Sequence, residues 1–169
     1  INTVKDLITF NMEKDAEEYI VGNTEDLSLS DITFLPVIPN PEKIMCIGLN
    51  YLEHKKETGR PDVDNPTIFT RFADSQIAHL QPLIKPDKSD RFDYEAEMAI
   101  VIGKGGRFIS EKDALNHIAG YSCYNDGSVR NYQRHTSQFT PGKNFPGTGG
   151  FGPYFCLLYT SDAADDVVR

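Results

Sequence analysis

Carboxylates occupy alternate positions at the start of an apolar stretch, FDYEAEMAIVIG, residues 92–103. In a β-strand, alternate side chains share one face and lie about 6.6 Å apart, so Asp93, Glu95 and Glu97 point the same way. Like charges held together at the entrance of a core raise one another's pKa values, and a divalent cation relieves the repulsion. Oxygen ligands suit Mg²⁺, Mn²⁺ or Ca²⁺. The alternative is a solvated strand end whose charges protect a sheet edge.

A further carboxylate lies in CYNDGSVRNYQ, residues 123–133. Asp126 ends a strand-like run and precedes the flexible Gly127, so it could bind the same cation. Arg130 and Gln133 are three residues apart, a spacing that places both on one helical face toward a bound anion. The alternative is a helix N-cap at Asp126 with an i, i+4 pair to Arg130, which stabilises a helix by a few tenths of a kcal/mol.

An imidazole and a carboxylate lie three residues apart in NYLEHKKE, residues 50–57. On a helix, His54 and Glu57 face the same side, and a carboxylate beside an imidazole fixes its tautomer and raises its basicity. This pair predicts a base that activates water. The alternative is an exposed histidine among charged neighbours.

The glycine-rich segment PGKNFPGTGGFGP, residues 141–153, contains Lys143, a candidate cation for a substrate carboxylate. Gly147, Gly149 and Gly152 satisfy a GxGxxG pattern, but a proline follows and no helix opens there. A dinucleotide fingerprint needs a strand, the glycines and then a helix, so we reject a dinucleotide site.

These residues need elements to position them, and the sequence predicts more strands than helices. Apolar, β-prone runs predict strands at 44–50, 67–72, 96–103 and 121–126. Both faces become apolar toward Ile102, so we expect the third strand to be buried on both sides. The spacing of apolar residues predicts a helix within residues 4–12, a two-turn helix capped by Asn50 and ended by Gly59, and a helix from Ser110 that stops at Gly120. Prolines make 35–42 a connector, and loops are expected from Thr140 onward.

Composition excludes several classes of function. The chain has 169 residues, 39% hydrophobic residues and a formal net charge of −8, which fits one soluble domain and not a nucleic-acid-binding protein. No apolar run approaches the roughly 20 residues of a membrane span, so no membrane partner is expected. Cys46, Cys123 and Cys156 form no CxxC motif and predict buried thiols in a reducing compartment, the cytoplasm.

The order of these motifs resembles the fumarylacetoacetate hydrolase family: GLNYxxHxxE, then DYExE, then NDxSxRxxQ, then GKxF…GP, over roughly residues 42–155. The resemblance implies an α+β, mainly β fold, a mixed β-sandwich roll that is usually dimeric, with a Mg²⁺ or Mn²⁺ site. The residues that match the family's motifs take the following roles: metal ligands Glu95, Glu97 and Asp126; a water-activating dyad, His54 and Glu57, on a lid that orders with substrate; and Arg130, Gln133 and Lys143 on the substrate's oxygens. Thr148 also matches a substrate-contacting position, although the sequence around it, FPGTGG, departs from the commoner FDTF of the family.

The resemblance implies a metal-dependent hydrolase that cleaves a C–C bond in a 2,4-dioxo acid of the acylpyruvate or fumarylpyruvate type. Lys143 then joins the dyad as a catalytic residue, because it stabilises the departing enolate with the metal. Members with nearly the same residues isomerise, hydrate or decarboxylate 2-oxo dicarboxylic acids in aromatic catabolism, so these reactions stay open. An inactive metal-binding interaction domain is the alternative of another class.

We expect three parts in the chain: a small N-terminal segment at 1–41, a catalytic domain at 42–155 and a non-native tail at 156–169. The tail sequence CLLYTSDAADD, residues 156–166, resembles a translated transposon-end sequencing adapter. The family pattern continues with further strands after the GP segment. We therefore expect an incomplete sheet with open edges and apolar surface, and a chain that is poorly soluble or inactive.

Overall fold

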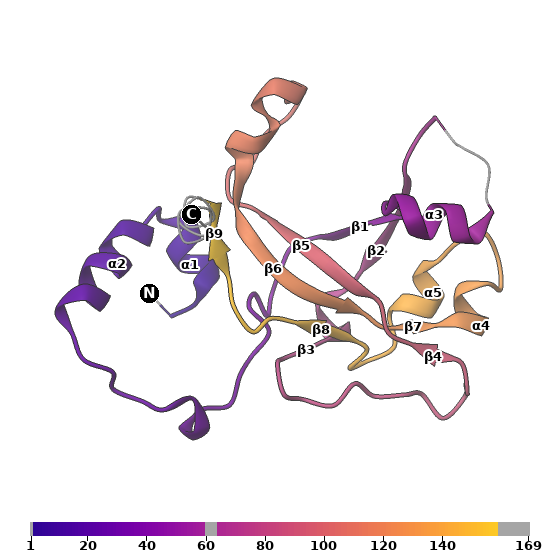
Figure 1. Ribbon diagram of the computed structural model, residues 1–169, viewed down its shortest axis with the longest axis horizontal. Helices are drawn as coiled ribbons and strands as arrows, with labels where there is room; N and C mark the ends of the chain where they lie inside the picture. Colours follow the sequence, from indigo (N-terminus) through magenta and orange to yellow (C-terminus); the bar gives the residue numbers. More distant parts are fainter. Residues whose placement is uncertain (1, 60–63, 159–169) are drawn as a thin grey trace.

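The computed structural model describes residues 2–59 and 64–158 and shows a strand-rich α+β chain (Figure 1). The strands are β1 Ile44–Gly48, β2 Thr67–Arg71, β3 Gln76–Ile77, β4 Phe92–Asp93, β5 Ala96–Ile102, β6 Ile118–Asp126, β7 Ser128–Val129, β8 Gly149–Phe151 and β9 Cys156–Leu157. The helices are α1 Val4–Thr9, α2 Glu13–Gly22, α3 Leu52–Thr58, α4 Arg130–Gln133 and α5 Thr140–Lys143, with 3₁₀ segments at Leu29–Asp31, Ala73–Ser75 and Glu111–His117.

A mixed sheet in the order β3-β8-β6-β5 forms the centre, and β9 also pairs with β6. β3 and β8 are parallel, whereas the other pairs in this sheet are antiparallel. Two small antiparallel pairs, β1-β2 and β4-β7, lie beside it. The strands expected at 44–50, 67–72, 96–103 and 121–126 are therefore confirmed.

The N-terminal segment packs onto this sheet. Thr3 caps α1, where its hydroxyl accepts from the Asp6 amide at 3.0 Å and the Asp6 carboxylate accepts from the Thr3 amide at 3.2 Å, a capping box. The helix turns Ile8 inward, where it joins Val37 and Ile38 against Phe151 of β8 in one apolar cluster. The residues before position 42 thus supply most of the fully buried members of this cluster.

The expected helix from Ser110 to Gly120 is wrong. A 3₁₀ segment ends at His117 and β6 begins at Ile118, because Ile118 and Gly120 pair with Ile102 and Val101 of β5. Long-range pairing here overrides local helical spacing. A Cβ on Gly120 would lie 2.2 Å from the carbonyl oxygen of Cys156, so this glycine admits the close approach of β9 and does not end a helix.

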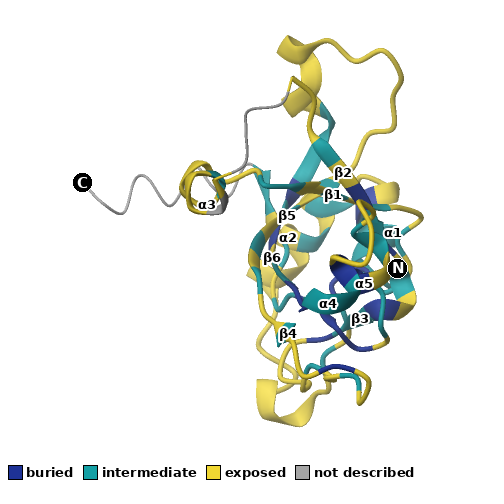
Figure 2. Cartoon of the chain, turned by 90° about the vertical axis from the view of Figure 1, so that its right-hand side faces the viewer, coloured by how far each residue is buried: buried dark blue, intermediate teal, exposed yellow. Residues whose placement is uncertain are grey.

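The expectation that β5 is buried on both faces is also wrong. Glu97, Ala99 and Val101 are half-buried, whereas the residues that alternate with them along the strand are exposed. Figure 2 colours the chain by this burial. The large side chains on the exposed face are Met98, 60% exposed, Ile100, 48% exposed, and Ile102, 62% exposed. β5 therefore buries one face, and an apolar stripe remains uncovered on the other.

Smaller expectations also change. The cap of α3 is Tyr51 without a side-chain hydrogen bond, not Asn50, although Gly59 does end the helix in the left-handed region at φ 61°. The segment after Thr140 is not all loop, since it forms α5 and β8.

Cys123 and Cys156 are exposed, whereas the sequence predicted that they would be buried, and Cys46 is half-buried. Cys156 and Leu157 pair with β6, while the remainder of the expected tail, 159–169, lies outside the described residues. Within those residues, no helix is long and apolar enough to cross a membrane.

Candidate active site

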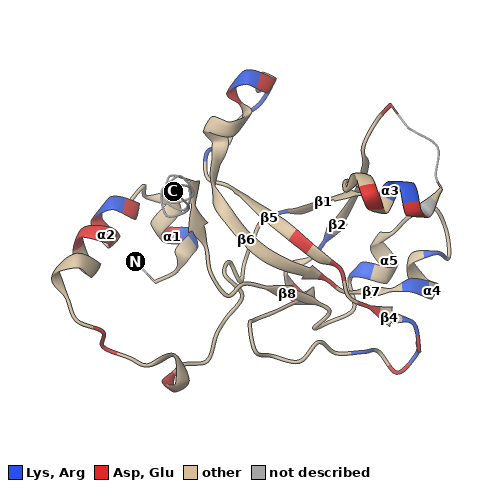
Figure 3. Cartoon of the chain, viewed as in Figure 1, with Lys and Arg blue, Asp and Glu red and all other residues tan. Residues whose placement is uncertain are grey.

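The predicted carboxylates meet where β5 starts and β6 ends. The amide of Asp126 donates to the carbonyl oxygen of Glu95 at 2.8 Å, and the amide of Glu95 donates to the side chain of Asn125 at 3.1 Å. Glu97 pairs across the strands with Tyr124 and so faces the same inner side as Asp126. Acidic residues of β5 and β6 and the basic residues of α4 and α5 gather at this end of the sheet (Figure 3).

Asp126 is 4% exposed and each of its oxygens binds a different cation. Its Oδ1 accepts from Nη1 of Arg71 at 2.6 Å, and its Oδ2 accepts from Nζ of Lys143 at 2.6 Å. Arg71 and Lys143 are themselves buried, at 2% and 1% exposure. This charge is therefore compensated on both sides, as a buried ion must be.

Glu95, like Asp126, has a different cation on each of its two oxygens. Its Oε2 accepts from Nζ of Lys143 at 2.7 Å, and its Oε1 accepts from Nη1 of Arg130. Burial opposes ionisation of Glu95, but the charges and hydrogen bonds of Lys143 and Arg130 outweigh it and hold its pKa below the usual value. Lys143 thus joins Glu95 to Asp126.

Arg130 completes the series on the other side of Glu95. Its Nε and Nη2 donate to Oδ2 of Asp93 at 3.0 and 2.8 Å, and its Nη1 also donates to Oε1 of Gln133 at 3.1 Å. Charges therefore alternate through one chain of contacts: Arg71, Asp126, Lys143, Glu95, Arg130 and Asp93. We call these six residues the charge ladder.

Glu97 lies beside this ladder, and no described cation forms an ion pair with it. Partial burial and the charges of Glu95 and Asp126 raise its pKa, which Lys143 and a hydrogen bond from Tyr51 only partly oppose. The charge of this end of the sheet is consequently unbalanced at Glu97.

The dyad residues lie on α3, as predicted, but at the surface. Nδ1 of His54 is 3.6 Å from Oε2 of Glu57, and their side chains are 54% and 76% exposed. Tyr51, at the cap of this helix, provides the contact with Glu97. The structure thus brings together the metal-ligand candidates, Lys143, Arg130 and Gln133, and it links α3 to them through Tyr51.

Thr148 is fully buried and its hydroxyl already has two partners. It accepts from Nη2 of Arg71 at 2.8 Å and donates to the carbonyl oxygen of Phe145 at 2.6 Å. Arg71 is the site residue that the sequence reasoning missed. The available signal was the alternation within TIFTR, which places Arg71 on the same face as Phe69, and both are buried.

The carboxylates fit a hard divalent cation in kind and charge, since Glu95, Glu97 and Asp126 offer oxygen donors and Glu97 carries an uncompensated charge. In the described part of the chain, however, no three His, Cys, Asp or Glu side chains are grouped closely enough to hold a metal ion. The ammonium of Lys143 lies between Glu95 and Asp126 instead. Metal binding therefore requires the carboxylates to exchange this contact for the ion.

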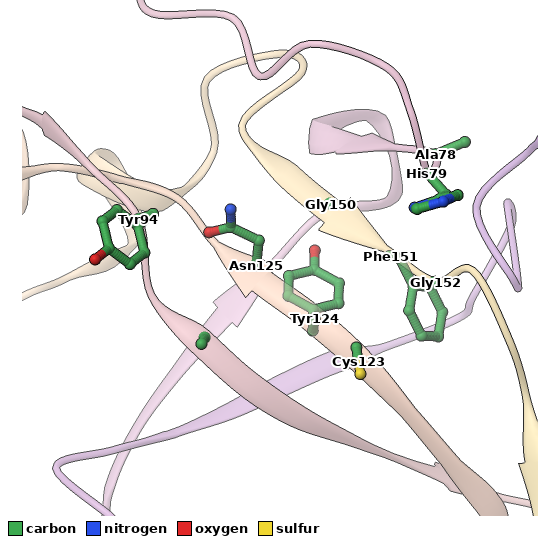
Figure 4. Close-up of a pocket in the computed structure, with 10 residues that line it drawn as sticks. Ala78, His79, Tyr94, Cys123, Tyr124, Asn125, Gly150, Phe151 and Gly152 are labelled. Carbon is green, nitrogen blue, oxygen red and sulfur yellow. The ribbon is translucent and has the colours of Figure 1, made fainter.

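A cavity of about 240 Å³ lies along β6 (Figure 4). Tyr94, Ala96 and residues 123–125 of β6 contribute to its wall, together with β8, and none of the predicted site residues lines it. Tyr124 also lines the cavity, and its ring centroid lies 5.8 Å from Cζ of Arg71. The cavity therefore borders the charge ladder at this ring.

Known proteins resemble this chain in sequence and in fold. A family model described as the fumarylacetoacetate hydrolase C-terminal domain matches residues 43–167. A mitochondrial oxaloacetate tautomerase of Xenopus laevis is 40% identical over 153 residues, which are 89% of this chain and 47% of that protein. A human oxaloacetate tautomerase is 37% identical, over 83% of this chain and 44% of its own length. The chain therefore spans about half the length of these relatives.

Solved structures also superpose on the fold of this chain. A probable 2-hydroxyhepta-2,4-diene-1,7-dioate isomerase of Mycobacterium abscessus superposes with a TM-score of 0.73 at 26% identity, covering 91% of this chain and 54% of that one. A fumarylacetoacetate hydrolase of Exiguobacterium antarcticum gives a TM-score of 0.70 at 28% identity, covering 93% and 56%. The mixed α+β fold inferred from the sequence is confirmed by these neighbours.

Proposed function

Because this chain belongs to the fumarylacetoacetate hydrolase family, we propose that it carries the active site of a divalent-metal-dependent isomerase that interconverts the keto and enol forms of a 2-oxo dicarboxylic acid. The charge ladder with Glu97 beside it is the observation that carries this proposal. The tautomerases and isomerases among its relatives favour isomerisation over the C–C bond hydrolysis that the motifs first implied.

The charge of the site supports a cation and then an anionic substrate. Asp93, Glu95, Glu97 and Asp126 oppose Arg71, Lys143 and Arg130, so four negative charges meet three positive ones. The net charge of −1 favours a divalent ion, and the loaded site then carries +1, which favours a carboxylate substrate. Glu95, Glu97 and Asp126 would hold Mg²⁺ or Mn²⁺, with Ca²⁺ also possible. The bound ion would supply Lewis-acid polarisation of the 2-oxo group.

The chain's own residues account for the proton transfer. His54, oriented by Glu57, takes a proton from the carbon next to the 2-oxo group, and the electron pair of the broken C–H bond forms the C=C bond of the enolate. Lys143 stabilises the charge that develops on the enolate oxygen. The protonated His54 then gives its proton to this oxygen, which yields the enol and restores the base. Arg130 and Gln133, now bound to each other, would hold a substrate carboxylate, and Thr148 would fix the loop beside it.

A second candidate is hydrolysis of a C–C bond in a 2,4-dioxo acid. The exposure of His54 and Glu57 favours it, because a base at the surface has water within reach. In this reaction His54 deprotonates water, the hydroxide attacks a carbonyl carbon, and the C–C bond breaks to release an enolate. An inactive metal-binding domain would bind the ion and catalyse neither reaction.

The test is a parallel assay of the 169-residue chain with oxaloacetate and with an acylpyruvate, with Mg²⁺, with Mn²⁺ and with a chelator. We expect metal-dependent equilibration of the oxaloacetate tautomers by the soluble fraction of the chain. An inactive soluble fraction would agree with the loss of activity expected from an incomplete sheet. Cleavage of the acylpyruvate alone would favour the hydrolase, and turnover that persists in the chelator would contradict metal dependence. Metal binding without turnover of either compound would favour the interaction domain. Light scattering would test the homodimer that we also propose.

A further inference from the structure

Arg71 is a buried arginine whose three acceptors come from distant parts of the chain. Its guanidinium donates to Oδ1 of Asp126 at 2.6 Å, to the carbonyl oxygen of Gly127 at 3.1 Å and to Oγ1 of Thr148 at 2.8 Å. Its side chain is fully buried, whereas that of Arg130 is 21% exposed. We propose that Arg71 is a positioning residue, which fixes Asp126 by one oxygen so that the other stays directed toward the metal site. This inference rests on the proposed metal-dependent function.

The three acceptors suit the fork of a guanidinium, which binds them through Nη1 and Nη2, while its Nε has no hydrogen-bond partner among the described residues. Its planar fork reaches acceptors on β6, on Gly127 and on the loop before β8, whereas an ammonium at the end of a lysine cannot span them with fixed geometry. The fit is tight, because a Cβ on Gly149 would lie 2.7 Å from Nη2 of Arg71 and 2.4 Å from the hydroxyl of Tyr124. Arg71 thus ties the Thr148 loop and Asp126 into one unit.

The two cations on Asp126 occupy different places in the charge ladder. Lys143 contacts both Glu95 and Asp126, so its ammonium occupies the space between two predicted metal ligands. Arg71 contacts Asp126 alone among the predicted ligands and uses the oxygen that does not face Lys143. We therefore expect opposite effects on metal affinity: Lys143 competes with the ion, whereas Arg71 prepares a ligand for it.

The experiment measures Mn²⁺ affinity of the 169-residue chain by the electron paramagnetic resonance signal of the free ion. Arg71→Lys keeps the charge and removes the fork, so we expect Mn²⁺ affinity to fall at least about tenfold. Lys143→Met removes a competing charge, and we expect the affinity to rise. Arg134→Lys is the matched control, since Arg134 is exposed and lies outside the charge ladder, and its affinity should not change.

Two further experiments distinguish a positioning role of Arg71 from a general loss of structure. When Asp126→Asn is already present, adding Arg71→Lys should weaken Mn²⁺ binding little further, because Arg71 acts through Asp126. Added guanidinium ion at tens of millimolar should restore part of the affinity of Arg71→Ala. Circular dichroism and the urea midpoint of each variant check that the chain is folded.

An Mn²⁺ affinity unchanged in Arg71→Lys, or a full additional loss in the double variant, would overturn the inference. A wild-type chain that binds no Mn²⁺ would overturn the proposed function instead. In that case the free energies of unfolding in urea decide whether Arg71 positions Asp126. If the effect of Arg71→Lys depends strongly on Asp126→Asn and on Thr148→Val, Arg71 ties these two residues together. Additive effects would refute this role.

Discussion

The charge ladder and helix α3 are two halves of one proposed site, and they are held in opposite ways. Arg71, Asp126 and Lys143 are buried, and each contacts groups from distant parts of the chain. On α3, His54 and Glu57 are mostly exposed, and Tyr51 at the cap of this helix donates a hydrogen bond to Glu97. The charged groups of the proposed site are thus held by burial, whereas the proposed base lies on an exposed helix.

This difference arises because an ion in the protein interior loses its hydration, whereas a charged side chain at the surface keeps it. Buried ions must have partners, so the charge ladder is determined by the fold as a whole. A short helix at the surface is marginal in water and depends on what docks against it. We therefore expect substitutions on α3 to change activity with little effect on stability, and substitutions in the charge ladder to change both.

The largest effect should come from His54→Ala. Loss of a general base typically lowers turnover about 10²- to 10⁴-fold, and we expect a decrease in this range for oxaloacetate tautomerisation. The urea midpoint and Mn²⁺ affinity should stay at their wild-type values because the histidine is exposed. A variant that loses metal binding together with activity would show that His54 belongs to the metal site, and the comparison between the two regions would fail.

Arg71→Met should have the largest effect on stability. It leaves Asp126 buried with only Lys143 as counter-ion, and breaking a buried pair costs about 3–5 kcal/mol. Equilibrium urea unfolding, monitored by tyrosine fluorescence, measures this loss. Glu57→Gln on α3 is the matched comparison, and its unfolding free energy should remain within about 0.5 kcal/mol of wild type. Equal losses in the two variants would contradict the contrast.

Glu95→Gln should weaken Mg²⁺ binding by roughly 10- to 100-fold, the range expected when groups around a metal are altered. The amide keeps the shape of the side chain and removes the negative charge that Lys143 and Arg130 stabilise. Isothermal titration with Mg²⁺ measures the change. Glu53→Gln on α3 serves as the control, because Glu53 is exposed and its carboxylate binds Lys56 on the same helix. An unchanged titration in Glu95→Gln would refute its assignment as a ligand.

Alkaline pH should lower the free energy of unfolding by less than the Arg71→Met substitution does. Burial, followed by the charge of Asp126, raises the pKa of Cys46 from 9.0 to about 12, and burial raises the pKa of Tyr124 from 10.0 to about 12. The unfolded chain therefore releases these protons at lower pH than the folded chain. Their contribution to stability is fully present below pH 9 and is lost as the pH rises toward about 12.

The measurement is the urea midpoint as a function of pH, with Cys46→Ala as the comparison. The variant should lose less stability between pH 9 and 11 than the wild type. Alkylation at pH 8 should modify the exposed Cys123 and Cys156 well before Cys46, because the thiolate is the reactive form. Rapid modification of Cys46 in the folded chain would contradict its raised pKa.

The smallest effect on stability should come from the outer face of β5. Ile100→Thr replaces a half-exposed apolar side chain, keeps the β-branched shape and should change the free energy of unfolding by no more than about 0.5 kcal/mol. It should nevertheless raise solubility, since Met98, Ile100 and Ile102 form an exposed apolar stripe. Static light scattering against concentration tests this, and lower solubility in the variant would show that the stripe does not drive association.

Much of the site was predictable because its residues follow local patterns. Glu95 and Glu97 share the pleat of one strand, and Asp126 ends the strand that pairs with it. The same pleat contained the signal for Arg71, but an arginine at the end of an apolar strand gives no indication of its partners, which lie 55 and 77 positions further along the chain. Gly120 was misread for the same reason, because the atom that requires a glycine belongs to β9.

The sequence by itself determined the chemical inventory: the carboxylates, the imidazole–carboxylate pair, the cations, and the order of motifs that identifies the family. Only the tertiary structure decided how these groups are paired. It placed Lys143 between Glu95 and Asp126, brought Arg71 behind Asp126, and left Glu97 with an uncompensated charge. Local spacing fixes which face a side chain occupies, whereas the partner of a buried charge is set by packing between segments far apart in the chain.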